Sequence, residues 1–105
     1  MAEVIWTNPA LSDLDAIADY IAVENPGAAR DIVKRVFANV DKLKQHPELG
    51  LVPEGLEDSR YRHLVEPPSR IFYRPQGESV FILHVMRSEW LFRKEKLGRG
   101  DEDES

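Results

Sequence analysis

Residues 59–90 contain three β-type segments separated by two short turns, and this order restricts the fold more than any other feature of the chain. The segments cover residues 60–65, 70–74 and 80–86, with Pro67-Pro68 in the first turn and Gly77 in the second. Turns this short join neighbouring antiparallel strands. The last segment, VFILHVM, is apolar on both faces, which predicts a central strand that is covered on both sides. The sequence therefore predicts a three-stranded antiparallel meander.

Two segments with helical periodicity precede the meander, and a short β-type run, EVIW at residues 3–6, precedes both. Leu14, Ile17 and Ile21 recur at intervals of three or four residues, which predicts a first helix that is capped by Asn8 and ends near residue 23. The second helix is predicted to begin at Asn25-Pro26 and to end at residues 46–47. Because the connection is very short, we expect the helices to form an antiparallel hairpin.

The predicted fold class is therefore α+β: an N-terminal strand, an antiparallel helical hairpin, a three-stranded antiparallel meander and a short C-terminal helix over residues 88–97. We expect one domain, residues 1–98, followed by an acidic, disordered tail at residues 99–105. The net charge is −5, but without the four acidic residues at 101–104 the chain has 14 positive and 15 negative groups. The chain has no cysteine, no signal-like start and no apolar run long enough to span a membrane, so we expect a cytoplasmic protein.

Most kinds of chemical site have no counterpart in the sequence. It contains no phosphate-binding glycine loop, no Gly-x-Ser-x-Gly motif and no metal-ligand spacing, so we expect neither a cofactor nor a metal. The remaining candidates are five arginines in the meander, which could bind an anion: Arg60, Arg62, Arg70, Arg74 and Arg87. The alternative is that they simply occupy the solvent-exposed face of a half-buried sheet.

Arg70 and Arg87 are the most specific pair among these arginines. In a hairpin that turns at Gly77 they are predicted to face each other across two strands. Two adjacent guanidinium groups repel unless an anion lies between them, but each could instead pair with a nearby carboxylate such as that of Glu66. The sequence leaves both possibilities open. His63 is the histidine placed for proton transfer beside the arginines.

The chain resembles the RelE/ParE superfamily of bacterial type II toxin–antitoxin toxins, and more closely its ParE-like branch. The resemblance covers residues 4–92 and consists of five pieces in order: VIWTNPALSDLDAIADYI, ENPGAA, LKQHPELG, RHLVEPPSRIFYR and VFILHVMRSE. It implies a helical hairpin packed on a mostly antiparallel sheet. By position, Arg70 matches the family's arginine on the penultimate strand, and Arg87 lies near a final-strand position where nucleases have an arginine or a histidine. Arg60 or Arg62 lies near their lysines.

The resemblance implies two possible targets, because RelE-like members cleave mRNA in the ribosomal A site whereas ParE-like members inhibit DNA gyrase. Glu89 and Trp90 stand where the nucleases carry a C-terminal tyrosine or histidine, and the near-neutral charge is unlike that of an RNA-bound nuclease. The favoured interpretation is a ParE-like gyrase inhibitor, which is not an enzyme and is neutralised by a cognate antitoxin. One alternative is a ribosome-dependent mRNA endonuclease that uses Arg70, Arg87 and His63; another is a non-toxic relative that only binds its antitoxin.

The resemblance also implies how the antitoxin would bind. A disordered antitoxin segment would fold onto the toxin, with an apolar face on the helices and carboxylates near the five arginines. Replacement of Arg70 and Arg87 by alanine is therefore expected to weaken antitoxin binding. A homodimer or a toxin–antitoxin hetero-oligomer is the expected assembly.

Overall fold

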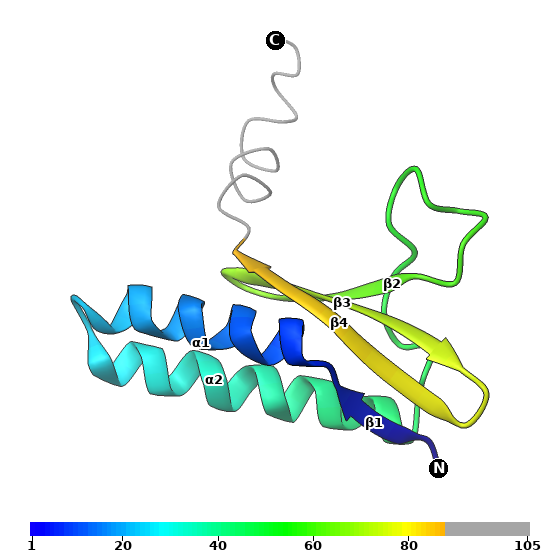
Figure 1. The fold of residues 1–105 in the computed structure, drawn as a ribbon, viewed down its shortest axis with the longest axis horizontal. Coiled ribbons are helices and arrows are strands. Elements are labelled where there is room, and N and C mark those ends of the chain that lie inside the picture. The colour runs from blue at the N-terminus through cyan, green and yellow to red at the C-terminus, as the bar shows by residue number, and fades with distance from the viewer. Residues whose placement is uncertain (88–105) are drawn as a thin grey trace, which may run out of the picture.

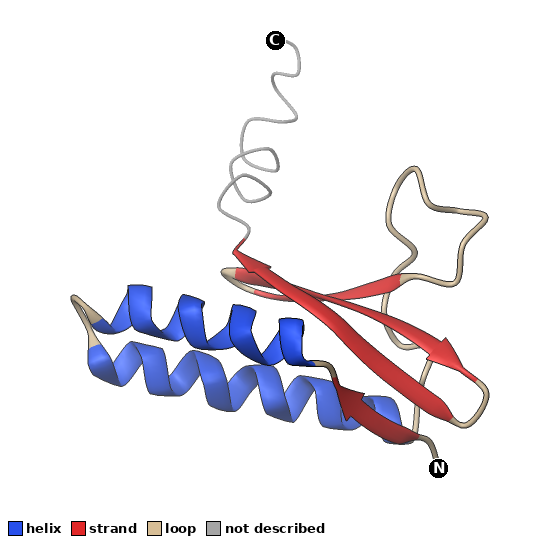
Figure 2. Ribbon diagram, in the orientation of Figure 1, coloured by secondary structure: helices blue, strands red, loops and turns tan. Residues whose placement is uncertain are grey.

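Two helices lie side by side against one face of a four-stranded sheet (Figures 1 and 2). The structure, a computed structural model, describes residues 1–87, so the predicted C-terminal helix and acidic tail lie outside the described residues. The elements are β1 (Glu3–Trp6), α1 (Asn8–Ala22), α2 (Pro26–Asp41), the 3-10 helix η1 (Lys42–Lys44), β2 (Arg62–Glu66), β3 (Ser69–Gln76) and β4 (Ser79–Arg87). The predicted α+β class, helical hairpin and antiparallel meander are confirmed.

The strand order is β1-β4-β3-β2, so β4 lies between β1 and β3 as the apolar sequence predicted. The N-terminal strand pairs with β4 in parallel, from Glu3 opposite Ser79 to Trp6 opposite Ile82. Parallel neighbours need a long crossover, and here the helical hairpin, β2 and β3 all lie between the two strands in the chain. None of the helices within residues 1–87 combines the length and the apolar character that a membrane span requires.

The start of α1 is fixed by Thr7 rather than by Asn8, so the predicted cap is wrong by one residue. The Thr7 side chain accepts a hydrogen bond from the Ala10 N–H at 3.3 Å, and its hydroxyl donates to the Ile82 carbonyl at 2.7 Å. Because β1 ends at Trp6, Thr7 is the one extended residue left to cap the helix. The predicted cap of α2 is confirmed, since the Asn25 side chain accepts from the Ala28 N–H at 3.0 Å.

The hydrophobic core lies between the helices and the sheet. Alternate residues of β3 are buried, which is the pattern of a strand with one covered face. The sheet contributes Leu64, Ile71, Tyr73, Val80, Ile82 and Val85 to this core, and the helical layer contributes Ala10, Leu14, Ile17, Ile32, Val36, Val40 and Leu43.

Within residues 1–87 the helices cover only one face of β4, and no described element covers the other face, which had been predicted to be covered as well. Met86 is 50% exposed, and Phe81 and Leu83 on the same strand are half-buried. The continuous apolar run VFILHVM therefore serves two purposes: one set of side chains packs in the core, and the other forms an apolar surface.

The loop between η1 and β2 is fastened to the sheet at Gly50. The Tyr73 side chain is completely buried, and its hydroxyl accepts a hydrogen bond from the Gly50 N–H at 2.7 Å. Arg62 donates to the Gly50 carbonyl at 2.8 Å, and Leu51 forms two backbone hydrogen bonds with His63 at 2.8 and 2.9 Å. This loop therefore protects part of the outer edge of β2.

Removal of the buried hydroxyl in Tyr73→Phe is expected to lower the free energy of unfolding by about 1–3 kcal/mol, because the Gly50 N–H loses its acceptor. Burial also raises the pKa of Tyr73 above its usual value of 10.0. The stability that Tyr73 contributes is thus present below pH 10 and is lost as the pH rises above it. Urea unfolding measures the difference in unfolding free energy between wild type and Tyr73→Phe. This difference should be smaller above pH 10 than at pH 7, and a larger difference above pH 10 would contradict the reasoning.

Candidate functional site on the open face of the sheet

The five arginines predicted as one anion-binding group do not share a surface. Arg70 lies opposite Met86 and Ser69 lies opposite Arg87, so Arg70 and Arg87 project from opposite faces of the sheet. The Arg87 guanidinium lies 4.0 Å from the ring centroid of Tyr20, on the side of α1. The predicted Arg70–Arg87 pair is therefore wrong, because a register one residue from the expected one reverses the face of every side chain.

Two other arginines occupy positions that differ from the prediction. The first meander strand begins at Arg62 rather than at residue 60, so Arg60 lies in the preceding loop and shares no strand face with Arg62. Arg62 donates hydrogen bonds to the carbonyls of Glu48 and Gly50. Its observed contacts are with the loop of its own chain, and Arg70 and Arg74 remain on the face that the helices leave uncovered.

This uncovered side of β2, β3 and β4 is called here the open face. It combines apolar side chains with two histidines and two arginines: His63, Val65, Arg70, Phe72, Arg74, Phe81, His84 and Met86. Val65 is 43% exposed and Met86 is 50% exposed, so the face presents apolar as well as cationic groups to solvent. Such a mixture suits an amphipathic partner better than a free anion.

His63, Arg70 and Phe72 form a cluster where β2 and β3 meet on the open face. The Arg70 Nε donates a hydrogen bond to His63 Nδ1 at 3.2 Å, and the Arg70 guanidinium lies 4.6 Å from the Phe72 ring centroid. The His63 ring stacks on Phe72 with 5.7 Å between centroids. Burial, together with the charge of Arg70, lowers the pKa of His63 below 6.5, and burial also lowers the pKa of Arg70.

This geometry decides what His63 can do chemically. Because Nδ1 accepts a hydrogen bond from a guanidinium, the neutral ring carries its proton on Nε2. A general base needs a free lone pair near the proton that it removes, and the lone pair of His63 is directed at Arg70. The carboxylate of Glu66 lies on the helical side of the sheet, where it is 3.1 Å from both Arg35 and Asn39 of α2. In this geometry Nδ1 of His63 is therefore not available as a base.

The contact between Arg70 and His63 can be tested by titration. Arg70→Ala removes a positive charge and the donor to Nδ1, so we expect the pKa of His63 to rise toward 6.5. NMR titration of the His63 ring protons measures this shift directly. Arg74→Ala is the matched control, because no hydrogen bond joins Arg74 to His63 in the structure, and it is expected to leave the titration unchanged. A pKa that stays the same or falls in the Arg70 variant would refute the assigned geometry.

A pocket of about 600 Å³ adjoins the cluster and shares Phe72 with it; it is called here the sheet-face pocket. Three parts of the chain form it: the start of α1, the loop before β2, and strands β3 and β4. Its lining residues are Thr7, Pro9, Leu56, Tyr61, Phe72, Arg74, Leu83 and His84. The sequence analysis missed this pocket, because no periodic pattern indicates that Leu56 and Tyr61 of an irregular loop return to the sheet.

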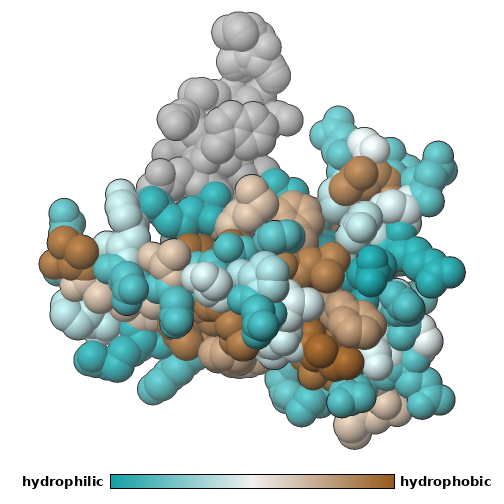
Figure 3. All heavy atoms as spheres, viewed as in Figure 1, coloured by the Kyte–Doolittle hydropathy of each residue, from teal (hydrophilic) through white to brown (hydrophobic). Residues whose placement is uncertain are grey.

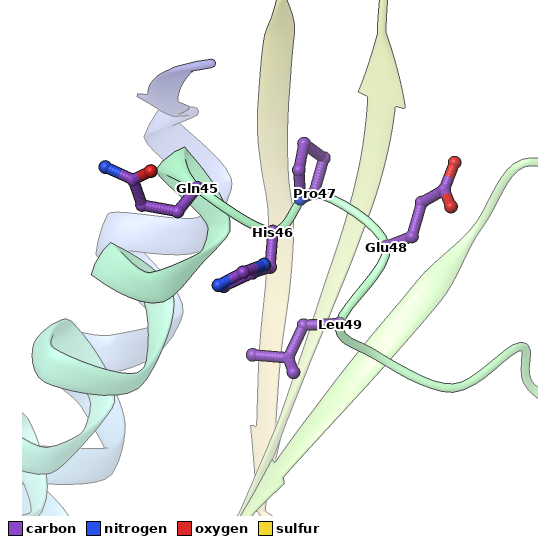
Figure 4. Close-up of a pocket in the computed structure, with 5 residues that line it drawn as sticks. All are labelled: Gln45, His46, Pro47, Glu48 and Leu49. Carbon is purple, nitrogen blue, oxygen red and sulfur yellow. The ribbon is translucent and has the colours of Figure 1, made fainter. Parts of the chain in front are cut away.

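In another hollow of the described chain, fewer polar side chains point toward a common position. This hollow, of about 570 Å³, is lined by residues 45–49 (Figure 4). These residues are consecutive, and the Gln45 and Glu48 side chains point away from each other in Figure 4. Near the turn of the helical hairpin Tyr20 is 62% exposed and Val23 is 83% exposed. Figure 3 shows hydrophobic atoms at the tip of the hairpin. No titratable cluster accompanies them within residues 1–87.

Comparison with known proteins gives three consistent results. A family model described as the ParE toxin of type II toxin-antitoxin system, parDE, matches residues 4–91. Toxin RelE2 of Caulobacter vibrioides is 36% identical over 89 residues, which cover 83% of this chain and 92% of the relative. Putative toxin Y4kP of Sinorhizobium fredii is 37% identical over 83 residues, which cover 79% of this chain and 84% of the relative.

A solved structure is also similar. A chain of the structure titled Chromosomal ParDE TA system from P. aeruginosa superposes with a TM-score of 0.71 and 31% sequence identity. The match covers 85% of this chain and 98% of that one. The two chains therefore share a fold over nearly all of that chain and most of this one.

Proposed function

Because the chain belongs to the ParE toxin family of type II toxin–antitoxin systems, we propose that it inhibits DNA gyrase and is neutralised by a cognate antitoxin. The observation that carries this proposal is the His63–Arg70–Phe72 cluster, in which the Nδ1 lone pair of His63 is directed at Arg70. A surface that combines exposed apolar side chains with a histidine held by a hydrogen bond suits a toxin that acts by binding its target. The similarity to a chain of a ParDE system supports the same target class.

An mRNA endonuclease is the second candidate, and the name Toxin RelE2 of one relative favours keeping it. Such an enzyme would have to activate a 2′-hydroxyl and stabilise the developing charge with neighbouring groups. The three residues considered for that role do not converge, because Arg87 lies on the other face of the sheet from Arg70 and His63. This arrangement supports the gyrase proposal over the nuclease.

The antitoxin is proposed to bind the open face. Val65 and Met86 offer apolar contact area, while Arg70 and Arg74 offer positive charge for carboxylates of the partner. Binding there would withdraw exposed apolar surface from water. This proposal replaces the five-arginine surface by a smaller one, in which Arg60 is peripheral and Arg62 and Arg87 have contacts with their own chain.

Purified gyrase distinguishes the two candidate functions. Added toxin is expected to block supercoiling of relaxed plasmid and to accumulate cleaved complexes, and prior mixing with the antitoxin should abolish both effects. Toeprinting on translating ribosomes tests the alternative function, and we expect no cut of the mRNA in the A site. An A-site cut together with unaffected supercoiling would reverse the assignment. If neither assay responds while the antitoxin still binds, the chain is the non-toxic relative.

A further inference from the structure

The sheet-face pocket is large enough to receive a large apolar side chain together with a neighbouring group. Its walls come from Pro9, Leu56, Phe72 and Leu83, and its volume of about 600 Å³ lies within the range of roughly 300–1,000 Å³ that is typical of ligand sites. It opens beside the His63–Arg70–Phe72 cluster because Phe72 belongs to both. A segment that lies across the open face can therefore reach the cluster and the pocket together.

The polar groups around the pocket show what kind of atom it accepts. The Thr7 hydroxyl already donates to the Ile82 carbonyl, and His84 Nδ1 lies 3.1 Å from an oxygen of Asp13. The Nε atom of Arg74, in contrast, is buried and has no hydrogen-bond partner among residues 1–87. A buried donor of this kind is unfavourable while it has no acceptor, and an acceptor from outside reaches it only when the Arg74 side chain rotates to expose it on the open face.

The charges of the residues that line the pocket indicate that this acceptor carries a negative charge. None of the residues that line the pocket is acidic, and Arg74 is the cation among them. The Arg74 guanidinium lies over the Phe81 ring at 5.9 Å, which holds it on the open face. A carboxylate next to a large apolar side chain would therefore complement both the walls and the unpaired N–H.

We propose that the sheet-face pocket receives one large apolar side chain of the antitoxin and that a neighbouring antitoxin carboxylate accepts a hydrogen bond from Arg74 Nε. The proposal rests on the proposed toxin–antitoxin function and adds an anchor point to it. It requires only that the antitoxin binds, so it holds whether the target is gyrase or the ribosome. Hydrophobic anchors in such pockets commonly dominate the affinity of an interface.

The first test uses the absence of cysteine from the chain, which allows a single thiol to be introduced without background. Leu56→Cys places the thiol in the pocket, and Leu49→Cys is the matched control, because Leu49 has similar exposure (45% against 41%) and lines the other hollow. The probe is the purified product of the adjacent open reading frame. Its addition is expected to slow alkylation at position 56 at least tenfold and at position 49 less than twofold. Equal rates at position 56 with and without the antitoxin would overturn the proposal.

The second test addresses the hydrogen bond. Arg74→Lys keeps the positive charge but removes the Nε–H, so we expect the dissociation constant of the antitoxin to rise about tenfold by calorimetry. Arg30→Lys, at an exposed position of α2, is the control and should remain within twofold of wild type. If the Arg74→Lys variant binds the antitoxin as tightly as wild type does, the proposed hydrogen bond from Arg74 Nε to the antitoxin is excluded. Failure of the wild-type protein to bind the antitoxin would reject the partner itself, whereas unaffected gyrase alone would reject only the proposed target.

Discussion

Gly50→Ala is expected to lower the free energy of unfolding by about 2–4 kcal/mol, from overpacking together with a weakened hydrogen bond. A Cβ atom at this position would lie 2.7 Å from the His63 carbonyl oxygen and 2.7 Å from Cε1 of Tyr73. Neither neighbour can move easily. The His63 oxygen accepts a backbone hydrogen bond from Leu51, and Tyr73 is completely buried in the core. The loop would therefore have to leave the sheet edge.

Urea unfolding monitored by circular dichroism measures this effect. Gly27→Ala is the matched control, because a Cβ there would have no neighbour nearer than 3.5 Å and the site is in the first turn of α2. That control should change the unfolding free energy by no more than about 0.5 kcal/mol. If both variants unfold at the same urea concentration as wild type, the close approach of Gly50 to Tyr73 is refuted.

The elements of this fold were predictable because each has a local sequence signal. The helical hairpin follows from apolar spacing and from Asn25-Pro26, and the meander follows from β-type segments separated by short turns. The parallel pairing of β1 with β4 was not predictable in the same way. It joins residues more than seventy positions apart, and a run of four residues carries no information about its neighbour.

The candidate site was harder to predict than the fold, because it depends on register and on loops. Strand spacing grouped Arg70 with Arg74 correctly, but a difference of one residue in the hairpin register moved Arg87 to the other face. The sheet shifts register between Phe72 and Tyr73, and no residue in that segment signals the irregularity. The pocket depends on Leu56, whose position follows from tertiary packing alone.

Arg70→Glu is expected to weaken antitoxin binding at least a hundredfold, which corresponds to about 3 kcal/mol. The substitution removes a cation from the open face and places a carboxylate where carboxylates of the antitoxin are proposed to lie. It also removes the guanidinium that lies over Phe72 and donates a hydrogen bond to His63. The two aromatic side chains therefore lose the contacts that hold them in place, in addition to the lost positive charge. Calorimetry against the purified antitoxin measures the change, and circular dichroism verifies that the variant is folded.

The distinction between the two faces of the sheet makes this prediction specific. Arg30→Glu introduces the same change of charge on an exposed position of α2 and is expected to alter the affinity less than threefold. Arg87→Ala, which the sequence grouped with Arg70, is now also expected to remain within threefold, because its guanidinium lies over Tyr20 on the helical side. Equal losses at Arg70 and Arg87 would mean that the antitoxin binds both sides of the sheet. A loss at Arg87 alone would move the binding surface from the open face to the helical hairpin.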